Sequence, residues 1–258
     1  MLFPVLVKKA FSRNLQYRSS HAINTFASAM FGLIYVSIWK GIGEPAGMNG
    51  YSLQNVIHYV AFNQAVLWIT LFITNGLGIE RSVRSGHIAL DLMRPVHLFY
   101  QLMGREWGQI GYQLIYKTVP IYFIYIWTIG LPVPTDAATW IFTLTSLASA
   151  SYMNICINYL IGVTALWTTE SNWLYWVHFS VSSVLSGFLV PIEWLPDWLS
   201  RISAWTPYPY MQHVPSKIYL GLAHPSTMCG GFLWCALLTA LCLAATAFVR
   251  RKVEVQGG

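Results

Sequence analysis

About six stretches of the sequence are long and apolar enough to cross a membrane, and they constrain the fold more than any other feature. A spanning helix needs about 20 mostly apolar residues, because the hydrocarbon core of a bilayer is about 30 Å thick and an α-helix rises about 1.5 Å per residue. The stretches that meet this requirement are 22–42, 54–77, 107–130, 137–167, 172–190 and 228–249. We therefore expect an all-α integral membrane protein with about six transmembrane helices.

The charge content supports the same expectation. Charged residues make up only 9% of the chain and hydrophobic residues 55%, whereas a soluble domain carries about 25% charged residues. The formal net charge of +6 does not indicate nucleic-acid binding, because the basic residues lie at the ends of the apolar stretches and not along one polar face. We expect membrane lipids around the protein and no nucleic acid as a partner.

The basic residues also predict the orientation, because cytoplasmic loops are enriched in Lys and Arg. If the N-terminus is inside, the outside segments hold only Lys40, Arg201 and Lys217. The inside segments then hold Lys8, Lys9, Arg13, Arg18, Arg81, Arg84, Arg94, Arg105, Arg250, Arg251 and Lys252. We expect a multi-pass protein of the plasma membrane, a bacterial inner membrane, with both termini in the cytoplasm.

Residues 1–20 carry too many charges to cross a bilayer. Their apolar side chains fall on one side of a helix: Phe3, Leu6, Val7, Ala10 and Phe11. This pattern predicts an amphipathic helix that lies on the cytoplasmic face of the membrane, and a disordered basic tail is the alternative. Residues 21–258 are expected to form a single six-helix transmembrane domain.

The longest cytoplasmic segment, 78–106, keeps more apolar side chains than a solvated loop needs. Ile88, Leu90, Leu92 and Met93 lie within a few residues of one another. We expect a short helix there that docks against a partner.

The outside segment 191–221 has a similar character. Its apolar residues recur at three- and four-residue spacing, which is typical of a helix: Leu195, Trp198, Leu199, Ile202 and Trp205. Pro207 and Pro209 end that helix, and a second short helix can follow. We expect a helix pair that dips into the outer leaflet without spanning it.

The sequence lacks the common motifs of nucleotide-binding, metal-binding and hydrolytic sites. It has no Gly-x-x-x-x-Gly-Lys-Ser/Thr phosphate loop, no His-Glu-x-x-His pair and no Gly-x-Ser-x-Gly elbow, so we expect no catalytic, cofactor-binding or metal-binding residue. Polar residues within the spans either hydrogen-bond between helices or line a translocation path. The candidates for the path are Asn63, Gln64, Trp68, His178, Ser182 and Ser186. Lys117, within the third span, packs against another helix, snorkels toward the interface or faces a substrate.

Two segments and the order of the elements resemble a known family. Residues Gly86-His87-Ile88-Ala89-Leu90-Asp91-Leu92-Met93-Arg94-Pro95 are similar to its loop segment that ends in Leu-x-Arg-Pro. Residues Pro191-Ile192-Glu193-Trp194-Leu195-Pro196-Asp197-Trp198-Leu199 are similar to its Pro-x-x-x-Leu-Pro-x-Trp-Leu segment before the last span. The chain thus resembles type-2 ABC exporter permeases, in the branch that combines one kind of ATPase with two different permeases.

The resemblance implies a type V exporter-like fold and a permease without its own ATPase site. Two ATPase subunits, which hold the ATP and Mg²⁺, would dock below it, and a second, different permease would complete a path lined mainly by the second and fifth spans. The residues implied in ATPase coupling are Ile88, Leu90, Asp91, Leu92, Arg94 and Pro95.

Aromatic residues in the second and fifth spans favour export of a hydrophobic or amphipathic small molecule, such as a drug, a toxin or a lipid-like compound. Export of a polysaccharide, glycolipid or peptide is the alternative. An intramembrane enzyme would use His178, His213 or Glu170, but the two histidines are expected at different depths. An ion-driven secondary transporter would need inverted repeats and acidic residues within the spans, which the sequence lacks.

Overall fold

The computed structural model describes residues 2–43 and 52–256, and the regular elements in this part of the chain are all helical. Within these described residues, four helical segments are long and apolar enough to cross a membrane. They contain the first, second, fourth and sixth predicted spans, which correspond to α2 (Arg18–Ile42), α3 (Leu53–Thr70), α8 (Ala137–Thr168) and α12 (Cys229–Gln256). The expectation of an all-α membrane protein is confirmed.

The third predicted span starts earlier than expected and contains a π-helical turn. Its consecutive elements are α6 (Leu98–Gln113), η3 (Leu114–Thr118) and α7 (Val119–Ile129). Pro120 has no N–H to donate to the carbonyl of Tyr116, and the hydroxyl of Thr25 on α2 donates to that carbonyl at 3.2 Å instead. The proline and its neighbouring helix thus account for the wider turn.

The fifth predicted span is shorter than expected. Its helix, α9 (Asn172–Leu185), has 14 residues, which corresponds to about 21 Å and is less than the hydrocarbon thickness. The chain leaves the helix at Gly187, where φ is +74°. The Gly187 carbonyl accepts hydrogen bonds from Tyr59 (2.6 Å) and Asn63 (3.1 Å) of α3, so this turn is held inside the bundle.

The second predicted span is also interrupted, because α3 ends at Thr70. Irregular backbone in a membrane protein must find partners inside the protein. Asn154 of α8 donates to the carbonyls of Thr70 (2.7 Å) and Leu71 (3.1 Å), and Asn158 accepts from the N–H of Gly76 at 3.3 Å. After this break come η2 (Asn75–Gly78), α4 (Ile79–Arg84) and α5 (His87–Met93).

The N-terminal segment forms helix α1 (Leu2–Asn14), followed by η1 (Leu15–Tyr17). It packs on α6, where Gly108 permits the close approach: a Cβ at that position would lie 2.3 Å from the carbonyl oxygen of Val7. The helix is present, and its position on the cytoplasmic membrane face stays a prediction.

The segment between α9 and α12 forms short helices, as the spacing predicts, and it reaches into the bundle. Its elements are η4 (Ile192–Trp194), α10 (Asp197–Ala204), η5 (Tyr208–Tyr210), α11 (His213–Tyr219) and η6 (Pro225–Met228). Gln212 donates to the hydroxyl of Thr70 at 2.6 Å, and the Tyr208 hydroxyl lies 3.3 Å from Nδ1 of His178. This segment therefore contacts the α3 break and His178, and its position in the outer leaflet stays a prediction.

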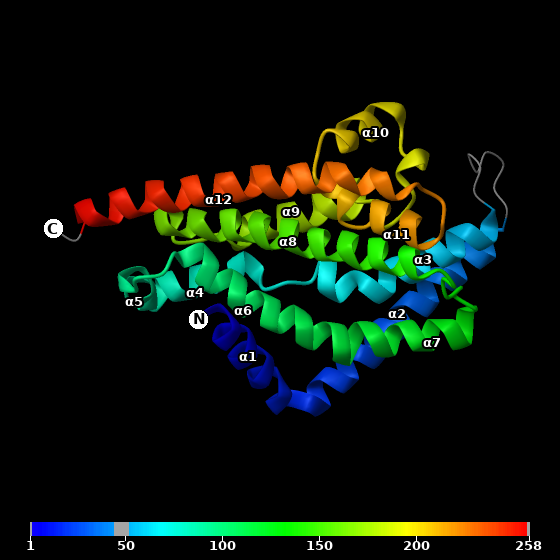
Figure 1. Cartoon of the computed structure of the whole chain (residues 1–258), viewed down its shortest axis with the longest axis horizontal. Coiled ribbons are helices and arrows are strands. Elements are labelled where there is room, and N and C mark those ends of the chain that lie inside the picture. The colour runs from blue at the N-terminus through cyan, green and yellow to red at the C-terminus, as the bar shows by residue number, and fades with distance from the viewer. Residues whose placement is uncertain (1, 44–51, 257–258) are drawn as a thin grey trace.

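Figure 1 shows α4, α5 and the end of α12 at one end of the molecule, and α10 and α11 at the other. Helix α12 lies along α8, and hydroxyl pairs join them, with Tyr152 and Thr239 at 2.6 Å. Both chain ends lie in the half that contains α4 and α5. That this half faces the cytoplasm stays a prediction.

Candidate functional site

A cavity of about 680 Å³ lies between α2, α3 and α9. From α3, Gln64, Leu67 and Trp68 line it, and Phe72 just beyond α3 completes that wall. The other lining residues are Asn24, Ala27, Ser28, Phe31 and Tyr35 of α2 and Phe179, Ser180, Ser183, Val184, Phe188 and Leu189 of α9 and the turn after it. Small-molecule sites are concave, mostly apolar and about 300–1,000 Å³ in volume, so this cavity has the size and character to hold an organic ligand.

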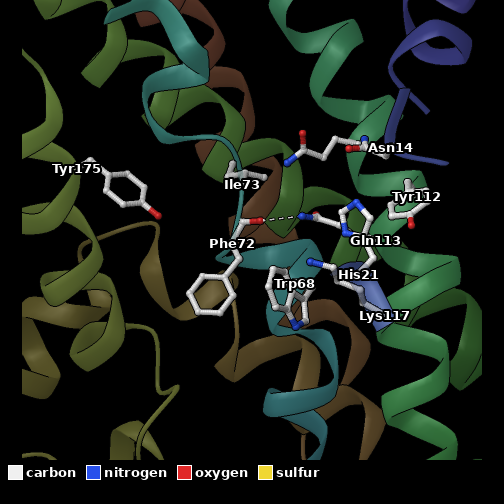
Figure 2. A pocket seen from close by; sticks show the side chains of 10 residues that line it. Asn14, His21, Trp68, Phe72, Ile73, Tyr112, Gln113, Lys117 and Tyr175 are labelled. Atoms are coloured by element: carbon white, nitrogen blue, oxygen red, sulfur yellow. Dashed lines mark hydrogen bonds between the residues drawn. The ribbon is translucent and has the colours of Figure 1, made fainter. Parts of the chain in front are cut away.

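A second cavity of about 260 Å³ adjoins the first, because Trp68 and Phe72 line both. Its wall is mainly polar and aromatic: Asn14, His21, Gln109, Tyr112, Gln113, Lys117 and Tyr175 contribute, together with Ile73. Figure 2 shows Tyr175 on one side of this cavity and His21, Gln113 and Lys117 on the opposite side. A polar cavity thus lies beside an apolar one, and the rings of Trp68 and Phe72 form part of the wall of each.

Lys117 sits in the π-helical turn and is only 4% exposed. Its Nζ lies 3.1 Å from the centroid of the Trp68 ring. An ionised lysine at the centre of a bilayer costs about 2.5–3.5 kcal/mol on insertion scales, and a desolvated cation–π contact offsets about 2 kcal/mol of that. The Trp68 indole N–H donates to the hydroxyl of Ser28 at 3.0 Å, which holds the ring in place under the ammonium.

Two of the six path candidates, Gln64 and Trp68, line the large cavity. The other four lie in helix packing and line neither cavity: Asn63, His178, Ser182 and Ser186 are buried. Nε2 of His178 lies 3.1 Å from Oδ1 of Asn154, and the Ser182 hydroxyl donates to the Phe179 carbonyl at 3.0 Å.

An ionic cluster in the segment after α9 joins that segment to α3. Glu193 lies 2.6 Å from Lys217 Nζ and 3.4 Å from His213 Nε2, and Nδ1 of His213 lies 3.0 Å from the hydroxyl of Tyr59. Burial acts to raise the pKa of Glu193, but hydrogen bonds from His213 and Lys217 and the attraction of His213 outweigh burial and lower the pKa well below its ordinary value. The ionised carboxylate thus holds α11 against η4.

The predicted coupling residues divide between two sides of α5. Ile88 and Leu92 pack against the hydrophobic core, whereas Leu90 is 59% and Met93 80% exposed. The buried carboxylate of Asp91 forms ion pairs with the guanidinium groups of Arg94 (3.1 Å) and Arg105 (3.4 Å). Pro95 is exposed on the surface. Helix α5 is thus anchored by one side and by Asp91, and it presents the apolar side chains of Leu90 and Met93 outward.

Helix α4 connects this end of the molecule to the cavity. Glu80 accepts hydrogen bonds from the backbone N–H (2.8 Å) and hydroxyl (3.1 Å) of Ser171, the residue before α9. Arg84 bonds to Glu80 at 3.0 Å and to Glu170 at 2.9 Å. Helix α4 is thus bonded directly to the residue before α9, and α9 forms one wall of the large cavity.

A family model described as ABC-2 family transporter protein matches residues 26–257, which is most of the chain. The chain belongs to this family. Among curated proteins, none matches the sequence.

As an ABC-2 transporter protein, the chain is the membrane subunit of an ABC transporter. Family members of this kind are transport subunits that generally lack an ATPase site of their own, and membership implies association with an ABC ATPase. The expected type-2 permease is therefore confirmed at the level of the family, and the branch with two different permeases stays a prediction.

Sequence reasoning missed several residues of this ABC-2 transporter protein. Glu80 and Ser171 are 91 positions apart, and no local pattern pairs a loop carboxylate with a helix start. No local pattern pairs Lys117 with Trp68 either, because the two residues lie on different helices. The signal available for the α3 break was the pair Asn154 and Asn158, because two asparagines at i, i+4 spacing on a spanning helix can satisfy the backbone of a neighbour.

Proposed function

We propose that the chain is the permease subunit of an ATP-driven exporter that moves a hydrophobic or amphipathic small molecule out of the cell. ATP is hydrolysed on two separate ATPase subunits, and a second, different permease faces this one. The observation that carries the proposal is the connection from α5 through α4 and Glu80 to Ser171 at the start of α9, because it links a surface suited to a partner with the wall of the cavity.

The ATPase contact is assigned to the outward side of α5. Leu90 and Met93 are exposed on a helix whose opposite side is anchored in the core, and an exposed apolar pair of this kind suits a protein interface. Movement of the ATPase subunits on binding ATP would shift α5 and α4 as a unit. This is a mechanical coupling between two sites, with the phosphoryl chemistry on the partner.

The path is assigned to the cavity between α2, α3 and α9. The outer sides of α2 and α9 carry exposed apolar side chains: Ile23, Phe26, Met30, Phe31, Ile34, Ile38, Trp173, Trp176, Val177 and Val181. A second permease packed there would close the cavity on its open side. Gln64 lines the cavity, and its buried Nε2 has no hydrogen-bond partner within the described residues; a rotation of its side chain toward the cavity would let it bind a polar group of the cargo.

The mainly apolar lining supports this cargo class, because it suits a hydrophobic or amphipathic molecule better than a polysaccharide. An ion-driven mechanism would need acidic groups in the path, and none of the described residues lining either cavity is acidic.

Transport by inside-out vesicles that contain the whole complex tests the proposal. We expect uptake of a fluorescent amphipathic dye only with ATP and Mg²⁺, and no effect of dissipating the proton gradient. Uptake driven by the gradient without ATP would replace the proposal with a secondary transporter.

A further inference from the structure

Lys117 is a buried cation with no anionic partner among the residues that the structure describes. It makes no ion pair with a carboxylate in the part of the chain that the structure describes, and its side chain contacts the Trp68 ring instead. It is 4% exposed and lines a cavity. Because charges attract strongly where water is excluded, an ammonium in this position favours an anion in the space beside it.

The walls of this cavity offer further binding groups. Gln113 is buried, donates through Nε2 to the Phe72 carbonyl at 3.3 Å, and leaves its buried Oε1 without a hydrogen-bond partner among the described residues. Nδ1 of His21 is also buried and has no partner in that part of the chain. Figure 2 shows both side chains near Lys117. An anionic headgroup that also carries a hydroxyl would pair with Lys117 and donate to Gln113.

The apolar cavity lies directly beside this polar one, since the rings of Trp68 and Phe72 belong to both walls. The polar cavity has about 260 Å³ and the apolar one about 680 Å³, and a water molecule takes about 30 Å³ in the liquid. A charged group fits the first, and a hydrocarbon chain fits the second. The two cavities together offer a polar and an apolar site side by side, which matches the polarity of one amphiphile.

We propose that the two cavities bind a single anionic amphiphile, with its carboxylate or phosphate group beside Lys117 and its hydrocarbon chain between α2, α3 and α9. The inference rests on the proposed export function, because it specifies that the exported molecule is anionic. Its binding step is independent of ATP, so it can fail while ATP-driven transport stands.

Binding to the purified complex in a neutral detergent, without ATP, tests the proposal. The probes are phosphatidylglycerol and phosphatidylcholine with identical chains, measured by native mass spectrometry. We expect the protein to bind the anionic lipid at least tenfold more tightly than the zwitterionic one. Lys117→Met abolishes this preference, and Lys117→Arg retains it. Lys40→Met removes a charge from the exposed end of α2 and serves as the matched control with the wild-type preference.

A second variant tests the position of the hydrocarbon chain without altering the buried charge. Ser183→Trp places a large ring in the apolar cavity, and we expect it to weaken binding of the anionic lipid at least tenfold. Retention of the anionic preference in Lys117→Met, or wild-type binding in Ser183→Trp, overturns the proposal. Should Lys117→Met fail to fold, Ser183→Trp and Lys117→Arg still decide it.

The same complex distinguishes a transported amphiphile from a resident lipid. When ATP and Mg²⁺ are added, a transported ligand leaves the site and a resident membrane lipid stays bound. Both results support the anionic site, whereas equal binding of the two lipids to the wild type contradicts it.

Discussion

Glu80 of α4 binds the start of α9: it accepts hydrogen bonds from the backbone N–H (2.8 Å) and the hydroxyl (3.1 Å) of Ser171, the residue before that helix. Ser171 is fully buried, so loss of the Glu80 carboxylate would remove a hydrogen bond from a buried N–H group. The contact joins the helix pair α4 and α5 to one wall of the large cavity across 91 positions of sequence.

Removal of this contact should uncouple transport from ATP hydrolysis. A hydrogen bond to a charged group contributes about 1.5–3 kcal/mol, so Glu80→Ala should lower ATP-driven transport at least about tenfold and leave assembly with the ATPase unchanged. Transport and ATPase rates of the same vesicles are the measurement. The control is Arg81→Ala, which changes an exposed residue on the same helix and should transport normally. Normal transport by Glu80→Ala would show that this contact is not needed for coupling.

The exposed side of α5 should hold the ATPase. Leu90→Asp places a charge in the proposed interface, where an unpaired buried charge costs several kcal/mol, and should remove the ATPase from the purified complex while the membrane subunit still inserts. Ser85→Asp adds the same charge to an exposed residue nearby and should retain the ATPase. Leu92 packs inward, so Leu92→Asp is expected to disturb folding and is less informative. Wild-type ATPase content in Leu90→Asp would exclude this surface.

Gly187 should be intolerant of any side chain. A Cβ there would lie 2.6 Å from the Tyr59 hydroxyl and 3.0 Å from Cβ of His213, and φ is +74°. Gly130, with φ of +76° and no atom within 4 Å of a built Cβ, is a matched control. Gly130→Ala should cost about 1–2 kcal/mol for its backbone conformation, and Gly187→Ala about 1–3 kcal/mol more from overlap. Thermal unfolding in detergent measures the difference, and equal melting temperatures would refute the close packing.

Acid should weaken the cluster around Glu193. Its pKa is lowered in the folded protein, so its contribution to stability is complete above its ordinary pKa of 4.5 and is lost as the pH falls below that value toward the folded pKa. Melting temperatures between about pH 7 and pH 3 should therefore fall less steeply for Glu193→Gln than for the wild type. Asp197→Asn, which removes an exposed carboxylate from the same segment, should keep the wild-type slope. Identical slopes for all three proteins would mean that Glu193 is not stabilised by its neighbours.

The sequence predicted the long helices well, because a bilayer imposes a length and a polarity on each span. Helix α8 begins at the predicted residue and ends one residue later, at Thr168. The interruptions of the predicted spans could not be predicted from the sequence, because they depend on hydrogen-bond partners from other helices. The α3 break needs the Asn154 amide, and the early end of α9 needs Tyr59 and Asn63 to bond with the Gly187 carbonyl.

The candidate site was predictable only in part. Residues of a spanning helix face lipid, protein or a cavity, and a single sequence does not separate these environments. Gln64 and Trp68 line the cavity, whereas His178 hydrogen-bonds with Asn154 in the interior. Lys117 is recognisable as an unusual charge in a span, but its position in the wall of the polar cavity and over the Trp68 ring depends on the packing of different helices.

We propose that this permease works with ATPase subunits and a second permease. Purification of the chain from its native membrane in mild detergent, followed by mass spectrometry of the intact complex, reports this composition. We expect one copy of this chain, one copy of a different ABC-2 transporter protein and two copies of an ATPase with a phosphate-binding loop. A complex without any ATPase, under conditions that preserve other transporter assemblies, would contradict it.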